Sequence, residues 1–254
     1  MARFTCSFIS YSLARTIEMT VIVPSLTCPE TMMPNPCHTP KAKYPVLYLL
    51  HGGWNDYTAW TSYTNIELFA EEHNIAVAIF SGENKAFRNH PGTGIVKENY
   101  STFLVHELPE FLQGYFPIST RPEDSYIAGL SMGGYGALYN GLNNPERFGA
   151  IGAFSAGIRL PGTEAAPDDP EEAAKRIIAE GKPFPAMFMS CGTADPLYKQ
   201  GAAFRDELIK MGVDVTWEES EGMGHEWRFW NHTVERFLKW IPRTDAYKGE
   251  LRKV

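Results

Sequence analysis

The sequence predicts an α/β fold with a mostly parallel central sheet, helices on both faces of that sheet and an antiparallel start. Two observations carry this prediction. Residues 46–50 form an uninterrupted apolar run, which is typical of a strand buried on both faces of a parallel sheet. From there to residue 240, short runs of this kind alternate with segments whose apolar residues recur at helical spacing. This alternation indicates parallel strands joined by helices that pack on both faces.

The first part of the chain differs from the rest. Residues 5–8 and 16–24 alternate and are rich in β-branched side chains, so two antiparallel strands are expected there. Residues 25–44 contain four prolines and are expected to form a surface loop. An antiparallel pair therefore precedes the parallel part of the sheet.

After this loop, strands and helices are expected in turn. Short apolar runs predict strands at 46–50, 76–80, 125–129, 150–154, 185–190 and 213–218. Apolar residues at helical spacing, or small residues after a tight turn, predict helices at 65–72, 100–116, 134–142, 199–211 and 227–240. The segment 100–116 is the clearest of them, because Phe103, Leu104, Leu108 and Phe111 follow helical spacing.

Residues 156–183 depart from this alternation of strands and helices. They contain Pro161, Pro167 and Pro170, and a short helix is expected at 171–180. We interpret the segment as a small excursion within one domain that spans residues 1–254, since α/β folds of this length often form a single unit. A short cap beside an active site and a plain loop are both compatible with its composition.

Composition and charge exclude several classes of function. The chain has 254 residues, of which 30 are acidic and 23 are lysine or arginine, for a formal charge of −7. Without a basic stripe, nucleic acid is not an expected partner. No apolar stretch approaches the roughly 20 residues that span a membrane, and no apolar core of a secretory signal follows the N-terminus. A cytoplasmic protein with no membrane partner is expected, and a homo-oligomer stays open.

The four cysteines, Cys6, Cys28, Cys37 and Cys191, show neither zinc-binding spacing nor a CxxC pair. No metal site is therefore expected. Free thiols are expected, as is usual in a reducing cytosol. The alternative is a disulfide between Cys28 and Cys37, which flank part of the proline-rich loop.

The segment Gly129-Leu130-Ser131-Met132-Gly133 fits the pattern G-x-S-x-G, in which a serine stands on a sharp turn between a strand and a helix. Such a turn raises the hydroxyl above the sheet edge, and its glycines let neighbouring backbone pass without a Cβ clash. The helix N-terminus behind the serine offers free N–H groups to a developing oxyanion. Ser131 is the candidate nucleophile, and the alternative is a helix N-cap in a tight turn.

The partners of the serine follow it along the chain in this type of fold, first an acid and then a histidine. Of the two histidines after Ser131, His232 lies inside the last expected helix, whereas His225 lies in a glycine-rich loop between a strand and a helix. His225 is therefore the candidate base. Asp195 follows the end of a strand and is the candidate acid, which would accept the histidine Nδ1–H and fix its tautomer. Its alternative role is a helix N-cap before a proline.

An oxyanion hole needs two backbone N–H donors. Met132, directly after the serine, is expected to supply one. The other is expected from the loop after the strand at 46–50, with Gly53 favoured and Trp54 as the alternative. His51 precedes the serine, so it is expected to anchor this loop rather than to act as the base.

Aromatic residues lie close to both expected catalytic loops. Trp54, Tyr57 and Trp60 stand in or after the oxyanion loop, and Trp227 follows the candidate base. Aromatic walls suit flat or sugar-bearing leaving groups, so all four are candidate substrate contacts. A place in the apolar core would suit them equally well.

Together these residues resemble the esterase D family of α/β-hydrolases and, within it, the tributyrin-esterase-like carboxylesterases. The segments that carry the resemblance are spread over nearly the whole chain and comprise residues 1–24, 49–53, 127–136, 191–195 and 224–227. The resemblance implies the α/β-hydrolase fold, a triad of Ser131, Asp195 and His225, and no metal or organic cofactor. Relatives commonly carry a non-glycine residue at the position of Gly53, a departure that bears on the second oxyanion donor and not on the triad.

The resemblance also implies a carboxylesterase that acts on short acyl chains, with a small ester, sugar-linked or aromatic, as substrate. Feruloyl esterases, acetyl-polysaccharide esterases and S-formylglutathione hydrolases are alternatives within the family. An acyltransferase on the same triad is an alternative of another class. A binding module without catalysis is disfavoured by the intact set of serine, acid and histidine.

Overall fold

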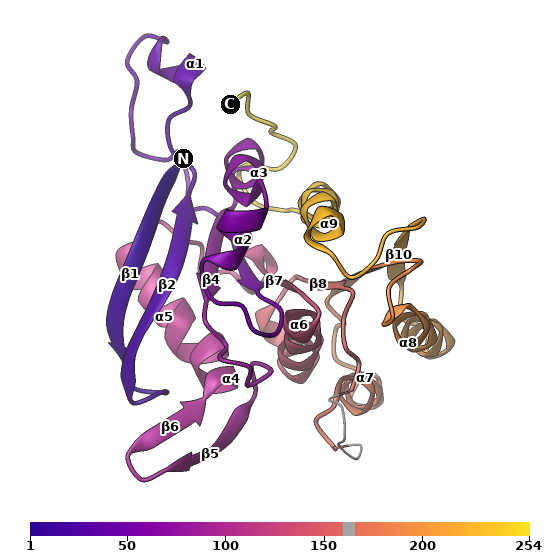
Figure 1. The fold of residues 1–254 in the computed structure, drawn as a ribbon. Coiled ribbons are helices and arrows are strands. Elements are labelled where there is room, and N and C mark those ends of the chain that lie inside the picture. Colours follow the sequence, from indigo (N-terminus) through magenta and orange to yellow (C-terminus); the bar gives the residue numbers. More distant parts are fainter. Residues whose placement is uncertain (160–165) are drawn as a thin grey trace.

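The computed structural model describes residues 1–159 and 166–254 (Figure 1). Its centre is an eight-stranded sheet. In spatial order the strands are β1 (Ala2–Ser10), β2 (Arg15–Val23), β4 (Ala76–Phe80), β3 (Val46–Leu50), β7 (Ser125–Leu130), β8 (Ala150–Phe154), β9 (Ala186–Gly192) and β10 (Val215–Ser220). From β4 to β10 in this order the strands pair in parallel, whereas β1, β2 and β4 pair antiparallel. The predicted mostly parallel sheet with an antiparallel start is confirmed.

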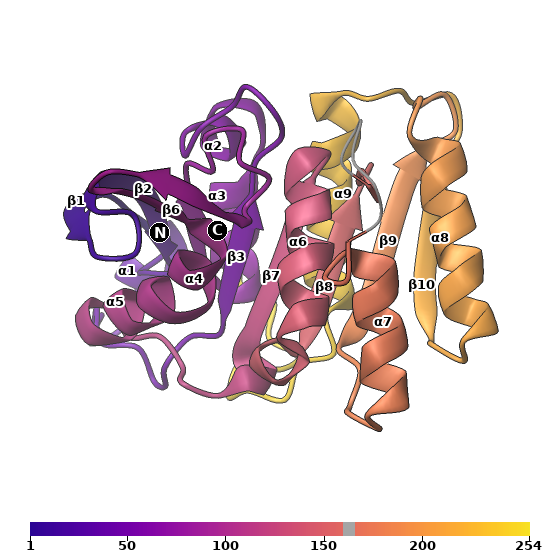
Figure 2. The same ribbon diagram turned by 90° about the horizontal axis from the view of Figure 1, so that it is seen from below.

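Helices cover both faces of the sheet (Figure 2). One face carries α4 (Tyr100–Thr102), α5 (Leu108–Tyr115), α6 (Met132–Asn143), α7 (Pro170–Ala179) and α8 (Tyr198–Lys210). The other face carries α2 (Ala59–Tyr63), α3 (Ile66–His73) and α9 (Trp227–Trp240). Within the described ranges, no helix combines the length and the apolar character that a membrane crossing requires.

The central strand β3 shows why both faces need apolar residues. Successive side chains of a strand point to opposite faces of its sheet. Val46, Tyr48 and Leu50 accordingly belong to the core layer beneath α4–α8, while Leu47 and Leu49 belong to the layer beneath α3 and α9. All five side chains are buried. An alternating apolar and polar strand could not have served both layers.

Among the described residues, two short α-helices lie where the sequence predicts none. One of them is α1 (Cys28–Thr31), inside the expected loop at 25–44. The Thr27 hydroxyl accepts a hydrogen bond from the Glu30 amide, and the Glu30 carboxylate accepts one from the Thr27 amide. This reciprocal capping is readable in the sequence as Thr-x-x-Glu before the turn. The other is α2, which follows the predicted oxyanion loop.

Residues 89–99 form a hairpin apart from the main sheet, made of β5 (Asn89–Thr93) and β6 (Val96–Asn99). Figure 1 shows it projecting beside the lower end of β1 and β2. Its strands are mostly exposed and include a proline and a glycine, so they lack the apolar alternation by which strands are predicted.

The helix expected at 100–116 forms, but it contains one widened turn. Phe103–Glu107 is π-helical, and the amide of Leu108 donates to the carbonyl of Phe103, five residues earlier. Pro109 has no N–H to donate, which removes the usual bond to the carbonyl four residues before it. The widened turn ends at Glu107, whose buried carboxylate accepts hydrogen bonds from the turn between β1 and β2.

The expected excursion at 156–183 lies partly outside the described residues, which omit 160–165. Its described part contains α7, close to the helix predicted at 171–180. This helix packs against α6, and Asp168 before it binds Arg88 and Tyr139. The described part therefore belongs to the helical layer on one face of the sheet.

All four cysteines are free, and Cys28 and Cys37 are exposed. The predicted free thiols are therefore present, and the alternative disulfide is not formed.

Candidate active site

Ser131 stands between the end of β7 and the start of α6, in a conformation that side-chain-bearing residues rarely adopt. Its φ is +53° and its ψ is −116°. The Ser131 amide donates to the carbonyl of Phe154 at the end of β8, at 2.9 Å. Strained backbone of this kind persists only where surrounding structure fixes it, and it clusters at functional sites.

The turn is tight because glycine lets two backbone segments meet. A Cβ atom on Gly133 would stand 2.4 Å from the carbonyl oxygen of Leu50 and 2.6 Å from that of His51. Both atoms belong to backbone at the end of β3, which cannot move aside like a flexible side chain. The first turn of α6 therefore rests directly on the start of the predicted oxyanion loop.

His225 and Asp195 are joined by a hydrogen bond, although 30 residues separate them in the chain. His225 Nδ1 lies 2.8 Å from Asp195 Oδ2. A carboxylate only accepts, so Nδ1 carries the proton and Nε2 is left free to act as a base. The His225 side chain is 29% exposed, whereas the Asp195 side chain has no exposed surface.

Burial raises the pKa of Asp195, but hydrogen bonds outweigh that effect and hold its pKa below the ordinary value. The donors are His225, the hydroxyl of Ser155 and the amide of Leu197, the last at 2.8 Å from Oδ1. Hydrogen bonds to the charged form of an acid favour that form. Asp195 is therefore a carboxylate at neutral pH, as its predicted role requires.

Ser131 and His225 line one cavity of about 660 Å³. It lies at the carboxyl edge of the parallel strands, where the loops after β3, β4, β7 and β10 meet, and this edge is the usual ligand site of such sheets. Twelve residues line it: Gly52, Gly53, Trp54, Asn55, Asn84, Leu130, Ser131, Met132, His225, Glu226, Trp227 and Trp230. The structure thus brings the serine–histidine pair together with all three candidate oxyanion donors, Gly53, Trp54 and Met132. Two of the predicted aromatic contacts, Trp54 and Trp227, line the same cavity.

The two candidates for the second oxyanion donor differ in what their amides do. The amide of Trp54 donates to Asn84 Oδ1 at 2.6 Å, so it is already engaged. The carbonyl of Gly53 accepts from Asn55 Nδ2 at 2.8 Å, and this bond fixes the peptide between Gly53 and Trp54. This pattern favours Gly53 over Trp54 as the donor.

His51 ties the oxyanion loop to the neighbouring loop. Its Nε2 accepts from the amide of Gly82 at 2.8 Å, so the proton is on Nδ1, which donates to the carbonyl of Gly52 at 2.7 Å. Burial lowers the pKa of this imidazole and keeps it neutral. His51 therefore anchors the loop, as the sequence predicts.

Two of the four predicted aromatic contacts lie elsewhere. The indole of Trp60 is fully buried and donates to the carbonyl of Leu50 at 3.1 Å, so its prediction as a substrate contact was wrong. Tyr57 lines a separate small pocket with Arg15 and Glu18. Trp54, by contrast, is 96% exposed and Trp227 lines the catalytic cavity.

Sequence reasoning missed three residues near the centre of the site. Ser155, fully buried with a φ of +44°, bonds the candidate acid. Trp230 packs at right angles to the ring of His225, with 4.8 Å between ring centroids. Asn84 holds the Trp54 amide. Only Trp230 had a signal in the sequence, as an aromatic in the first turns of the helix that follows His225.

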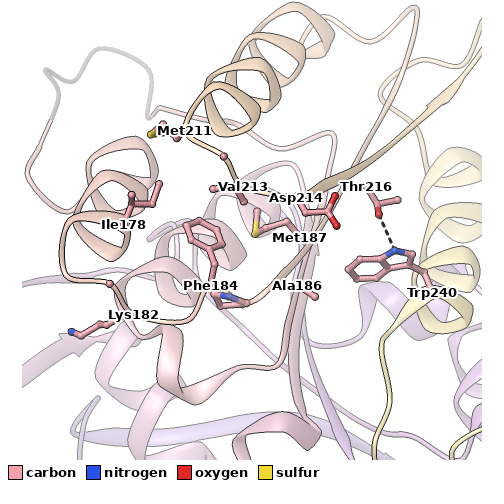
Figure 3. A pocket seen from close by; sticks show the side chains of 13 residues that line it. Ile178, Lys182, Phe184, Ala186, Met187, Met211, Val213, Asp214, Thr216 and Trp240 are labelled. Carbon is pink, nitrogen blue, oxygen red and sulfur yellow. Dashed lines mark hydrogen bonds between the residues drawn. The ribbon is translucent and has the colours of Figure 1, made fainter.

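A second cavity, of about 450 Å³, lies at the opposite edge of the sheet (Figure 3). Its walls come from the amino ends of β9 and β10 and from the ends of α7, α8 and α9. Figure 3 shows Phe184, Met187 and Val213 around it and the indole of Trp240, which donates to the Thr216 hydroxyl at 2.9 Å. No serine, cysteine or histidine lines it, so the catalytic candidate remains the cavity at the carboxyl edge.

Comparison with known proteins identifies the family. The sequence matches the family model Esterase, described as "Putative esterase", over residues 26–236. The chain belongs to the Esterase family. This esterase is 30% identical over 224 residues to an acetyl esterase of Caldicellulosiruptor saccharolyticus, and the match covers 78% of the chain and 83% of the relative.

Solved structures agree with this assignment. The esterase resembles the fluorophosphonate-binding serine hydrolase F of Staphylococcus aureus, with a TM-score of 0.83, 25% identity and coverage of 96% of this chain and 99% of that one. It also resembles an S-formylglutathione hydrolase of Staphylococcus aureus, with a TM-score of 0.80, 25% identity and coverage of 94% and 98%. The chain is a serine-type carboxylic ester hydrolase with the α/β-hydrolase fold, and the resemblance found in its sequence is confirmed.

Replacement of Gly133 by alanine tests the close approach at the turn. We expect Gly133→Ala to lower the free energy of unfolding by about 3 kcal/mol or more, because rigid backbone cannot yield to the added methyl group. Urea unfolding followed by tryptophan fluorescence measures the change. Gly114→Ala in α5 is the matched control, since its Cβ meets nothing within 4 Å. Equal stability of the two variants would contradict the interpretation.

Proposed function

We propose that the esterase hydrolyses short-chain acyl esters through an acyl-enzyme on Ser131. The observation that carries this proposal is the shared cavity of Ser131 and His225, with His225 bonded to a buried, charged Asp195. Nucleophile, base and orienting acid are the three parts that such chemistry needs. The acetyl esterase among the relatives supports a short acyl group.

In the proposed first step, Ser131 Oγ attacks the ester carbonyl carbon while His225 Nε2 takes the hydroxyl proton. The negative charge that develops on the carbonyl oxygen is stabilised by the amides of Met132 and Gly53. His225 then gives the proton to the leaving alcohol, and the acyl group stays on Ser131. Water repeats the sequence in the second step and releases the carboxylic acid. Asp195 stabilises the imidazolium in both steps.

Ser131→Ala tests the nucleophile. We expect kcat for p-nitrophenyl acetate to fall by about 10⁵-fold or more, since the acyl-enzyme cannot form. A fluorophosphonate probe should label the wild type and leave this variant unlabelled. Ser7→Ala is the control for the labelling, because Ser7 is an exposed serine of β1 that does not line the cavity. Hydrolysis by Ser131→Ala at the wild-type rate would refute the proposal.

Asp195→Asn tests the orienting acid. We expect kcat to fall by about 10⁴-fold, because an amide in this position favours the wrong histidine tautomer.

The low pKa of Asp195 has a second consequence. It stabilises the fold above the pKa of an unfolded aspartate, about 3.9, and this contribution is lost as the pH falls through the lower folded value. Urea unfolding between pH 5 and 2 should show that loss in the wild type and a smaller loss in the variant.

We further propose that the ester carries a sugar or aromatic leaving group. Trp54 supports this, because it combines 96% exposure with a φ of +60° at the rim of the cavity. A bulky residue rarely adopts such a backbone, and here the bond from its amide to Asn84 fixes it. Flat indole surfaces held in this way suit the faces of sugars and aromatic rings.

Trp54→Ala tests this substrate class. We expect kcat/KM for aryl or sugar acetates to fall by about five- to thirtyfold relative to ethyl acetate, which has no ring to stack. Steady-state kinetics on a panel of acetyl-sugar, feruloyl and alkyl esters measures the ratio. An equal fall for ringed and ringless esters would mean that Trp54 acts on the oxyanion loop and not on the leaving group.

A further inference from the structure

The lining of the catalytic cavity contains one acidic side chain and no basic one other than the imidazole of His225. Of the twelve residues that line it, Glu226 is the one aspartate or glutamate. No lysine or arginine is among them. An ester that enters the cavity therefore meets a carboxylate, and among the residues that the structure describes no lysine or arginine lines the cavity.

Glu226 lies at the rim of the cavity, next to the candidate base in the chain. Glu226 follows the candidate base directly and stands at the N-cap of α9, yet its side chain does not cap that helix. Its Oε1 instead accepts from the amide of Gly224 at 3.2 Å, on the other side of His225. The residue is exposed, so the carboxylate remains at the mouth of the cavity.

The cations on the neighbouring loop are already paired with acids. Lys85 lies 2.9 Å from Glu98, and Arg88 lies 3.1 Å from Asp168. Arg15 reaches the same loop from β2 and lies 2.6 Å from Glu83. Arg228, two residues after Glu226, does not line the cavity. The chain as a whole carries a formal charge of −7, so its surface offers no excess of cations to offset Glu226.

We infer that Glu226 is a specificity-determining residue that makes the esterase select uncharged esters and reject esters with an anionic leaving group. The inference rests on the proposed function. A carboxylate at the rim of the cavity repels a leaving group that itself carries negative charge and does not repel a neutral one. The substrate class is therefore esters of neutral sugars or neutral alcohols. Thioesters of glutathione, which carries two carboxylates, are disfavoured, in contrast to the substrate named for the S-formylglutathione hydrolase relative.

Two chromogenic acetates of similar shape test the inference. One is p-nitrophenyl acetate, which is neutral, and the other is 5-acetoxy-2-nitrobenzoate, which carries one carboxylate. The measured quantity is the ratio of kcat/KM for the anionic ester to that for the neutral ester, each corrected for its rate of hydrolysis by hydroxide. We expect Glu226→Gln to raise this ratio by about three- to tenfold at low salt. Gln can still accept the hydrogen bond from Gly224, so the variant changes charge more than shape.

A salt series and a matched control variant distinguish an electrostatic effect of Glu226 on the ratio from a structural effect of its substitution. Raising NaCl to 0.5 M should raise the ratio in the wild type, with no mutation needed, and should have little effect in Glu226→Gln. Glu221→Gln removes a charge from the same loop at a residue that does not line the cavity, and should leave the ratio within about twofold of the wild type.

An unchanged ratio in Glu226→Gln, an equal fall for both esters, or a wild-type preference for the anionic ester would overturn the inference. Failure of the proposed function has a different signature. In that case the wild type would hydrolyse neither acetate faster than the Ser131→Ala variant does.

Discussion

The carbonyl oxygens of Leu50 and His51 fill the space in which a Cβ atom at position 133 would stand. Because the start of α6 rests on the end of β3, the loops that follow β3 and β7 meet at one point beside the cavity. The same turn holds Ser131 at a φ of +53°, and β7 bears this strain because it pairs with β3 on one side and with β8 on the other. Placement of the hydroxyl therefore depends on backbone contact more than on any side chain.

The loop after β3 is in turn held by the loop after β4. His51 accepts from the amide of Gly82, and Asn84 accepts from the amide of Trp54. Four residues of the second loop have positive φ: Glu83, Asn84, Ala86 and Phe87. Both loops at this edge thus adopt costly backbone conformations. Strain of this kind at an active site is tolerated where it fixes amides in the direction that the chemistry needs.

The fold and the placement of the three candidate catalytic residues could be predicted because both leave local or topological signals. Apolar runs identify doubly buried strands, and the carboxyl ends of β7, β9 and β10 share one edge, which brings residues 131, 195 and 225 together. Contacts between loops leave no such signal. The sequence around Asn84 contains no pattern that predicts its hydrogen bond with the amide of Trp54, 30 residues earlier. Trp54 and Trp60 look alike in sequence, and only α2, which buries Trp60 against the core, tells them apart.

Two carboxylates flank His225, and their surroundings give them opposite effects. Asp195 has no exposed side-chain surface and is held by hydrogen bonds. Its electrostatic interaction with the imidazole of His225 is therefore only weakly screened by water. Glu226 is exposed, so water and salt weaken its field, but the field extends over the mouth of the cavity that substrate must cross. In the proposed mechanism the buried acid orients the base at short range, and in the inferred selectivity the exposed acid beside the same base acts on the charge of the incoming ester. The proposed division between catalysis at position 195 and selection at position 226 follows from the different burial and hydrogen bonding of the two side chains.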